Sequence, residues 1–188
     1  MGEASTGVPF DAFRAKHRGQ SRERFLDQVV VPHLAVPSQT TSASAGGWGY
    51  GTVVDGAMDA ATAMKALEAL EAQERQGADS LEGKVLHPVR KRGAAGNVPG
   101  LMIMVGRSGV SDIALDDGHV SKFHAYFKLT KGEWVVCDAQ SAYGTFVNDR
   151  RAPTTGGLAV ASGDRIRFSD DLTAVFWSPE DLFEKIAD

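Results

Sequence analysis

Hydrophobic and polar residues alternate with a period of two from Leu81 almost to the end of the chain. Because successive side chains of a strand point to opposite faces, this period predicts short β-strands that each bury one face. Turn residues separate the runs at regular intervals, which predicts a β-sandwich of roughly eight to eleven strands. The expected strands are Lys84–Arg90, Leu101–Val105, Ile113–Leu115, Phe123–Leu129, Glu133–Cys137, Thr145–Asn148, Arg165–Phe168 and Leu172–Trp177.

A helical period replaces this alternation in three places. Asp59 to Gln76 carries apolar residues at three- and four-residue spacing, which predicts an amphipathic helix. Phe10 to Gln28 is charged and compatible with a helix, but Gly19 interrupts it, so one helix and two short helices are both open. Ser178, followed by a proline and two acidic residues, predicts the start of a short C-terminal helix.

The run from Val29 to Val36 is apolar and β-branched but is cut by Pro32 and followed by Pro37. Proline cannot donate a ladder hydrogen bond, so the run is expected to be an extended arm or an edge strand. Such an arm could pack against the core of its own chain or cross to a second protomer.

These patterns predict a mainly β chain, an antiparallel β-sandwich of about eleven short strands with a helical and extended N-terminal arm and a short C-terminal helix. Residues 1 to 9 are expected to be frayed. The expected segments are an N-terminal arm over 1–37, a linker rich in Gly, Ser and Thr over 38–57, an amphipathic helix over 58–77, the β-sandwich over 80–179 and a helix over 179–188.

Composition narrows the classes of function. The formal net charge is -4, which argues against the strongly positive field of a nucleic-acid binder. The single cysteine, Cys137, lies in an apolar run, so we expect a buried thiol in a reducing compartment. No apolar run of signal-peptide or membrane-spanning length occurs, so a cytoplasmic protein without membrane contact is expected.

Polar residues at the ends of the expected strands form one ordered set between Val105 and Asp164. These are Gly106-Arg107, Ser121-Lys122-x-His124, Ser141-x-x-Gly144-Thr145-Phe146-Val147-Asn148, then Leu158 and Gly163-Asp164. An arginine, a serine and a lysine at loop positions on a rigid sheet suit the capture of an anion. They do not suit a buried catalytic pocket.

In this order and spacing, the set resembles a forkhead-associated (FHA) domain of bacterial type, over about residues 80 to 179. The resemblance implies an eleven-strand sandwich that binds phosphothreonine peptides through loops at one end, without catalysis. It assigns phosphothreonine binding to Arg107, Ser121 and Lys122, which can supply donors from several directions to a phosphate of charge near -2. The alternative is that Arg107 pairs with a carboxylate such as Asp112 and that Ser121 only shapes a turn.

The resemblance also assigns supporting and peptide-contacting positions. His124 is expected to be a scaffold residue, and a catalytic Ser–His pair is not expected because residues three apart in a strand point to opposite faces. The expected loop supports are Gly106, His124, Ser141, Gly144, Thr145 and Asn148. The expected peptide contacts are His119, Ala142 and Tyr143.

One position departs from the family. Where the family usually has an asparagine that grips the peptide backbone, this chain has Tyr143, which could stack on the peptide or cover the site. Two hypotheses therefore stay open: an adaptor that binds phosphothreonine, and a degenerate FHA scaffold that assembles proteins or self-associates without phosphate.

The partner expected for the first hypothesis is a phosphothreonine-containing protein, either a Ser/Thr kinase or its substrate. Two further expectations concern the chain itself. The site could bind a phosphorylated threonine of the same chain, or the N-terminal arm could contact a second protomer. The candidate threonines are Thr6, Thr40, Thr41 and Thr52. No catalytic residue, metal site or cofactor is expected, because no nucleophile elbow, His-Glu-x-x-His or phosphate loop occurs.

Overall fold

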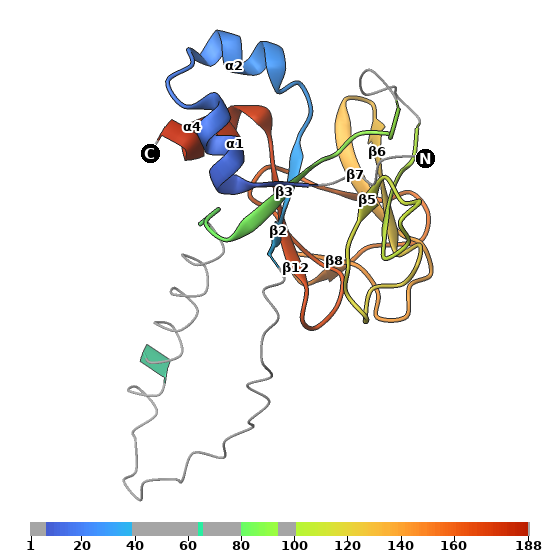
Figure 1. The fold of residues 1–188 in the computed structure, drawn as a ribbon. Coiled ribbons are helices and arrows are strands. Elements are labelled where there is room, and N and C mark those ends of the chain that lie inside the picture. The colour runs from blue at the N-terminus through green and yellow to red at the C-terminus, as the bar shows by residue number, and fades with distance from the viewer. Residues whose placement is uncertain (1–6, 39–63, 66–79, 94–100, 188) are drawn as a thin grey trace, which may run out of the picture. The chain divides into compact units, whose positions relative to one another are not determined.

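The computed structural model describes residues 7–38, 64–65, 80–93 and 101–187, and these contain two β-sheets. The first sheet, in spatial order, contains β1 (Val8–Pro9), β3 (Lys84–Pro88), β2 (His33–Pro37), β12 (Thr173–Trp177), β11 (Arg165–Arg167), β8 (Phe146–Val147) and β9 (Arg150–Arg151). The second contains β10 (Leu158–Ala159), β7 (Glu133–Asp138), β6 (Ala125–Thr130), β4 (Ile103–Gly106) and β5 (Ile113–Ala114). The predicted mainly β sandwich is therefore confirmed (Figure 1).

The core lies between the two sheets and follows the period of two. Alternate residues of the second sheet, such as Val105 and Phe127, are fully buried, and so are Leu34 and Ile166 of the first sheet. Phe127 stacks on Phe176 with ring centroids 5.9 Å apart, which links β6 to β12 across the sandwich. This rigid core holds the loops at the ends of the strands.

A helical layer covers the outer face of strands β2, β3 and β12 (Figure 1). It consists of α1 (Phe10–His17), α2 (Arg22–Gln28) and α4 (Pro179–Ala187). Its aromatic centre, Phe25, is fully buried. Gly19 separates α1 from α2 with a φ of 75°, so the two-helix alternative is correct. Ser178 caps α4 by accepting a hydrogen bond from the backbone N–H of Asp181, at 3.2 Å, as predicted.

Strand β2 shows where the expected arm was wrong. It is not an edge strand, because it pairs with β3 on one side and with β12 on the other. Pro32 precedes the strand and Pro37 is its last residue, so the N–H groups between them remain available for the ladder. The apolar run therefore packs on the core of its own chain and belongs to the sandwich.

Two smaller expectations also fail. Val8 and Pro9 were expected to be frayed but pair with β3, where Val8 lies opposite Leu86. The sandwich is not purely antiparallel, because β4 and β5 run parallel, with Val105 opposite Ile113.

The predicted linker over 38–57, the loop over 94–100 and most of the helix over 58–77 lie outside the described residues. Met64 and Lys65 are helical and exposed. The chain divides into two compact units, residues 1–38 with 81–188 and residues 39–80. Among the described helices, none combines the length and apolar character needed to cross a bilayer.

Candidate functional site

Three loops meet at one end of the sandwich. The first, after β4, carries Arg107; the second, before β6, carries Ser121 and Lys122; the third, residues 139–145 after β7, contacts the second through the Ala142 backbone N–H. The backbone N–H of Arg107 donates to the Ser121 carbonyl oxygen at 2.9 Å, and that of Ser108 donates to the Lys122 carbonyl oxygen at 3.2 Å. A Cβ atom at Gly106 would lie 2.3 Å from the Lys122 carbonyl oxygen. Only glycine permits this approach of two backbones. Arg107 and Ser121 are therefore neighbours because Gly106 lacks a side chain.

The side chains at this junction keep polar atoms directed to solvent. Arg107 is exposed, and its Nε donates to the Val120 carbonyl oxygen at 3.2 Å. Its two terminal amino groups make no hydrogen bond with a described residue. Ser121 Oγ accepts a hydrogen bond from the backbone N–H of Ala142 at 3.1 Å, which orients the hydroxyl and leaves its proton for another acceptor. The Lys122 side chain is exposed.

The alternative in which Arg107 pairs with Asp112 is wrong. The Asp112 carboxylate is buried and accepts hydrogen bonds from Lys91 Nζ at 2.9 Å, from the Arg92 backbone N–H at 2.9 Å and from the Met104 backbone N–H at 2.8 Å. Its oxygens are therefore occupied by groups other than Arg107.

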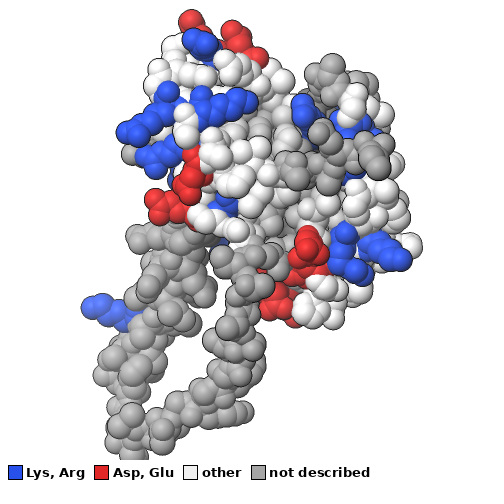
Figure 2. All heavy atoms as spheres, in the orientation of Figure 1, with Lys and Arg blue, Asp and Glu red and all other residues white. Residues whose placement is uncertain are grey.

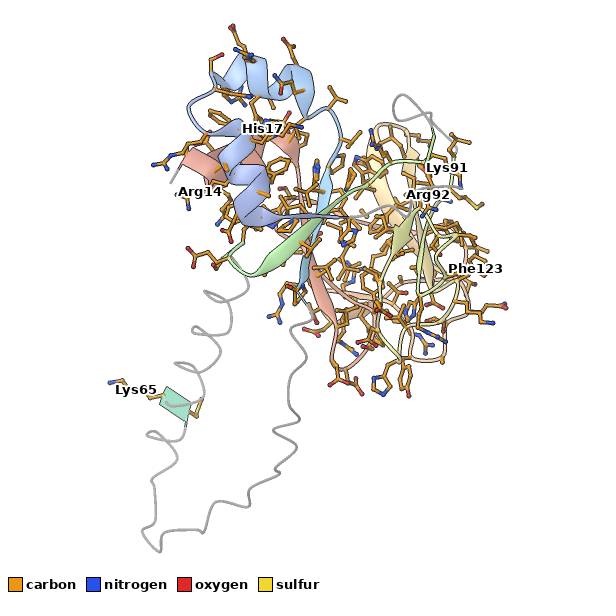
Figure 3. The ribbon with its side chains drawn as sticks, in the orientation of Figure 1. Arg14, His17, Lys65, Lys91, Arg92 and Phe123 are labelled. Atoms are coloured by element: carbon orange, nitrogen blue, oxygen red, sulfur yellow. The ribbon has the colours of Figure 1, made fainter. Side chains whose placement is uncertain are left out.

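Lys91 and Arg92, which are labelled in Figure 3, form hydrogen bonds with the loop that carries Arg107, a role that sequence reasoning missed. The Arg92 guanidinium donates to the carbonyl oxygens of Gly109, at 3.0 Å, and Ser111. Both basic residues lie outside the run from Arg107 to Asp112, so only the fold brings them to this loop.

His124 joins two of the loops. Its ring is fully buried, Nδ1 accepts from the Ser121 backbone N–H at 3.1 Å, and Nε2 donates to the Gly144 carbonyl oxygen at 3.2 Å. Because a backbone N–H can only donate, the ring proton sits on Nε2 and the imidazole is neutral. Burial lowers the pKa of His124 below its usual value, which favours the same neutral form.

The expected absence of a Ser–His pair therefore has a different physical reason. Ser121 lies in a loop before β6, so strand alternation does not apply. Its backbone N–H, and not its hydroxyl, contacts the His124 ring.

Asp138 organises the third loop and was missed by sequence reasoning. Its buried carboxylate accepts from the Ser141 hydroxyl at 2.6 Å, the Ser141 backbone N–H at 3.1 Å and the Thr145 hydroxyl at 2.8 Å. Ser141 Oγ in turn accepts from the Gly144 backbone N–H at 2.9 Å. An aspartate that ends an apolar strand three residues before a serine is a turn signal that could have identified it.

Gly144 and Asn148 occupy backbone positions that most residues avoid. Gly144 has a φ of 79° and Asn148 a φ of 45°. The Asn148 side chain donates to Asp164 at 2.6 Å and accepts from the Arg165 backbone N–H at 3.0 Å. Asn148 therefore supports the turn after β8 and its contact with β11.

Tyr143 is half exposed and turned towards His119. Their ring centroids lie 5.6 Å apart with the planes at 88°, an edge-to-face contact. His119 Nδ1 also lies 3.2 Å from a carboxylate oxygen of Asp171. The three predicted peptide-contact positions are thus divided: His119 and Tyr143 touch each other, whereas Ala142 touches Ser121.

The surface shown in Figure 2 carries basic and acidic side chains close together at the lower end of the sandwich. No group of three or more His, Cys, Asp or Glu residues that could hold a metal ion occurs in the described part of the chain.

Comparison with known proteins shows which protein family the strands and loops of the site resemble. Residues 103–169 match the model of the FHA domain family. The chain is 38% identical over 95 residues to the oxoglutarate dehydrogenase inhibitor of Corynebacterium efficiens, covering 48% of this chain and 65% of that protein. It is 45% identical over 62 residues to the glycogen accumulation regulator GarA of Mycolicibacterium smegmatis, covering 33% of this chain and 37% of that protein.

The chain thus spans less than two thirds of the length of these relatives. Among solved structures, it is similar to the N-terminal FHA domain of S. cerevisiae Rad53p in complex with a phosphothreonine peptide, with 22% identity and a TM-score of 0.38. That match covers 45% of this chain and 73% of the other.

Proposed function

Because residues 103–169 match the FHA domain family, we propose that the protein is a phosphothreonine-binding adaptor in Ser/Thr-kinase signalling. The observation that carries the proposal is the junction of Arg107 with Ser121. Their backbones are hydrogen-bonded at 2.9 Å, the Ala142 backbone N–H orients the Ser121 hydroxyl, and the Arg107 and Lys122 side chains are exposed.

The chemistry of this junction matches a phosphate group. Arg107 offers a planar fork of donors, Ser121 a short hydroxyl and Lys122 a flexible cation, whereas the phosphate offers three acceptor oxygens. A charge-assisted hydrogen bond contributes about 1.5–3 kcal/mol. Loss of Arg107 should therefore weaken phosphopeptide binding by about tenfold or more.

The names of the relatives support regulation by binding and not by catalysis. One is named as an inhibitor of oxoglutarate dehydrogenase and another as a regulator of glycogen accumulation. For this chain we propose a partner that carries a phosphothreonine, either a Ser/Thr kinase or a kinase substrate. Capture of a phosphorylated threonine of the chain itself remains part of the proposal, although the candidate threonines lie outside the described residues.

The proposal is tested by fluorescence anisotropy with a degenerate phosphothreonine peptide library and its unphosphorylated counterpart. We expect wild type to bind only the phosphorylated library and Arg107→Ala to lose most of that binding. Arg22→Ala is the matched control, because Arg22 is an exposed arginine in helix α2. Equal binding of the two libraries by wild type would refute phosphate recognition.

A second candidate function is a scaffold that assembles proteins without phosphate, and Tyr143 favours it. Tyr143 replaces the family's asparagine and already contacts His119. Sedimentation of the full chain before and after treatment with a phosphatase would discriminate between the two functions. A self-assembly that does not depend on phosphate would keep the same mass after the treatment. Residues 79–188 alone would be a poor substitute, because they lack strand β2 from the middle of the first sheet.

A further inference from the structure

Three arginines lie on the outward face at one side of the first sheet. Arg167 of β11 lies opposite Phe146 of β8, and Phe146 lies opposite Arg151 of β9. Residues opposite each other in neighbouring strands project to the same face. The neighbouring pair, Ile166 and Val147, is buried in the core, so the row of Arg167, Phe146 and Arg151 faces outward.

Arg165 extends this row by one position, because it lies two residues before Arg167 in β11 and is exposed. We call Arg151, Arg165 and Arg167, with the Phe146 ring between them, the arginine row.

The arginine row begins at the third loop of the candidate site. A Cβ atom at Gly144 would lie 3.2 Å from Arg151 Nε and 3.2 Å from Phe146 Cε2, so both side chains rest against the glycine. The Arg167 guanidinium carbon lies 4.0 Å from the centroid of the Phe146 ring. On the same loop, the Ala142 backbone N–H holds the Ser121 hydroxyl. The phosphate-binding junction and the arginine row are therefore connected through residues 142–146.

The positive charge of the row is only partly compensated. Arg167 lies 3.4 Å from a carboxylate oxygen of Asp170, which is 84% exposed and so forms a weak, solvated ion pair. Arg151 and Arg165 form no ion pair with another described residue. Asp164 lies nearby in sequence, but its carboxylate is occupied by the Asn148 amide and the Ala161 backbone N–H.

We propose that the arginine row binds acidic side chains that flank the phosphothreonine in the same partner segment, an inference that rests on the proposed function. A guanidinium held against an aromatic ring keeps its outward donors in a defined orientation, and carboxylates match its fork geometry. The Ala142 N–H contacts Ser121 and Gly144 lies against Arg151, so the flank of a segment whose phosphate binds Arg107 and Ser121 would run along residues 142–146 towards Arg151. The ligand class is therefore a phosphothreonine segment with an acidic flank.

The test compares fluorescein-labelled peptide sets that share one phosphothreonine and carry either Asp and Glu or Asn and Gln at the flanking positions. We expect wild type to bind the acidic set about three- to tenfold more tightly at low salt, since each exposed ion pair contributes little on its own. This preference should shrink at high salt because the charges are exposed. Arg151→Gln and Arg165→Gln should each reduce it while leaving the neutral set unchanged.

One control variant and three possible outcomes keep the inference separate from the proposed function. Arg22→Gln, on helix α2, should leave both affinities unchanged. Equal binding of the two sets by wild type would overturn the arginine row as a subsite while leaving phosphothreonine binding intact. An equal loss of affinity for both peptide sets in Arg151→Gln would also overturn this inference, because Arg151 would then only support the loop at Gly144. Binding of neither set would overturn the proposed function, and this inference with it.

Discussion

Replacing His124 with alanine tests whether one buried ring holds the loops of the site together. The substitution removes the acceptor for the Ser121 backbone N–H and the donor for the Gly144 carbonyl oxygen. It also removes an edge-to-face contact with Phe168, at 5.6 Å between ring centroids. Both loops would lose their shared attachment.

The expected cost follows from the burial of the two partners. A buried polar group left without its hydrogen bond costs about 1–3 kcal/mol. Ser121 is only half buried, so its N–H should be at the low end, near 1 kcal/mol, whereas Gly144 is buried and should cost about 2 kcal/mol. The cavity left by a fully buried ring adds about 1–2 kcal/mol. The free energy of unfolding should therefore fall by about 4–5 kcal/mol.

Urea unfolding followed by tryptophan fluorescence measures this loss, because Trp177 is buried beneath the helical layer. His119→Ala is the matched control: its side chain is 55% exposed and its contacts with Tyr143 and Asp171 face solvent, so the same chemical change should cost about 1 kcal/mol or less. Phosphopeptide affinity should fall in His124→Ala even at temperatures where the variant is folded. A loss of stability below about 1 kcal/mol would refute the view that His124 links the loops.

Two further predictions concern backbone approach and pH. Gly106→Ala should destabilise the protein by about 1–3 kcal/mol, because its Cβ would collide with the Lys122 carbonyl oxygen. Gly109→Ala is the control, because a Cβ atom there would meet open space and should have little effect. Equal melting temperatures of the two variants would contradict this prediction. Burial lowers the pKa of His33 and of His87 to about 4 from 6.5. Between pH 4 and pH 6.5 the unfolded chain therefore binds more protons than the folded protein. The free energy of unfolding should fall by about 3 kcal/mol per histidine as the pH drops from 6.5 to 4. Urea unfolding of wild type and of His87→Gln between pH 6.5 and 4 should show that the free energy of unfolding depends less on pH in the variant. The same pH dependence in both proteins would contradict this prediction.

Local patterns predicted much of the sandwich and of the site. The period of two located most strands to within two residues, and Gly19 and Ser178 marked helix boundaries that the structure contains. The ordered set from Gly106 to Asn148 predicted a resemblance to the FHA domain family, and residues 103–169 match the model of that family. These signals succeed because turns, caps and alternation depend on neighbouring residues. The assignment of Arg107, Ser121 and Lys122 as phosphate ligands stays a prediction.

The amino-acid sequence by itself determined which residues form strands, where turns fall and which polar side chains stand at the strand ends. Only the tertiary structure decided that β2 inserts between β3 and β12, that Arg92 braces the Arg107 loop and that Arg151 joins Arg167 around Phe146. These pairings join residues far apart in the chain, and their free energy comes from burial and hydrogen bonds formed only after the sheets assemble. Local periodicity holds no information about which distant strand will be the neighbour.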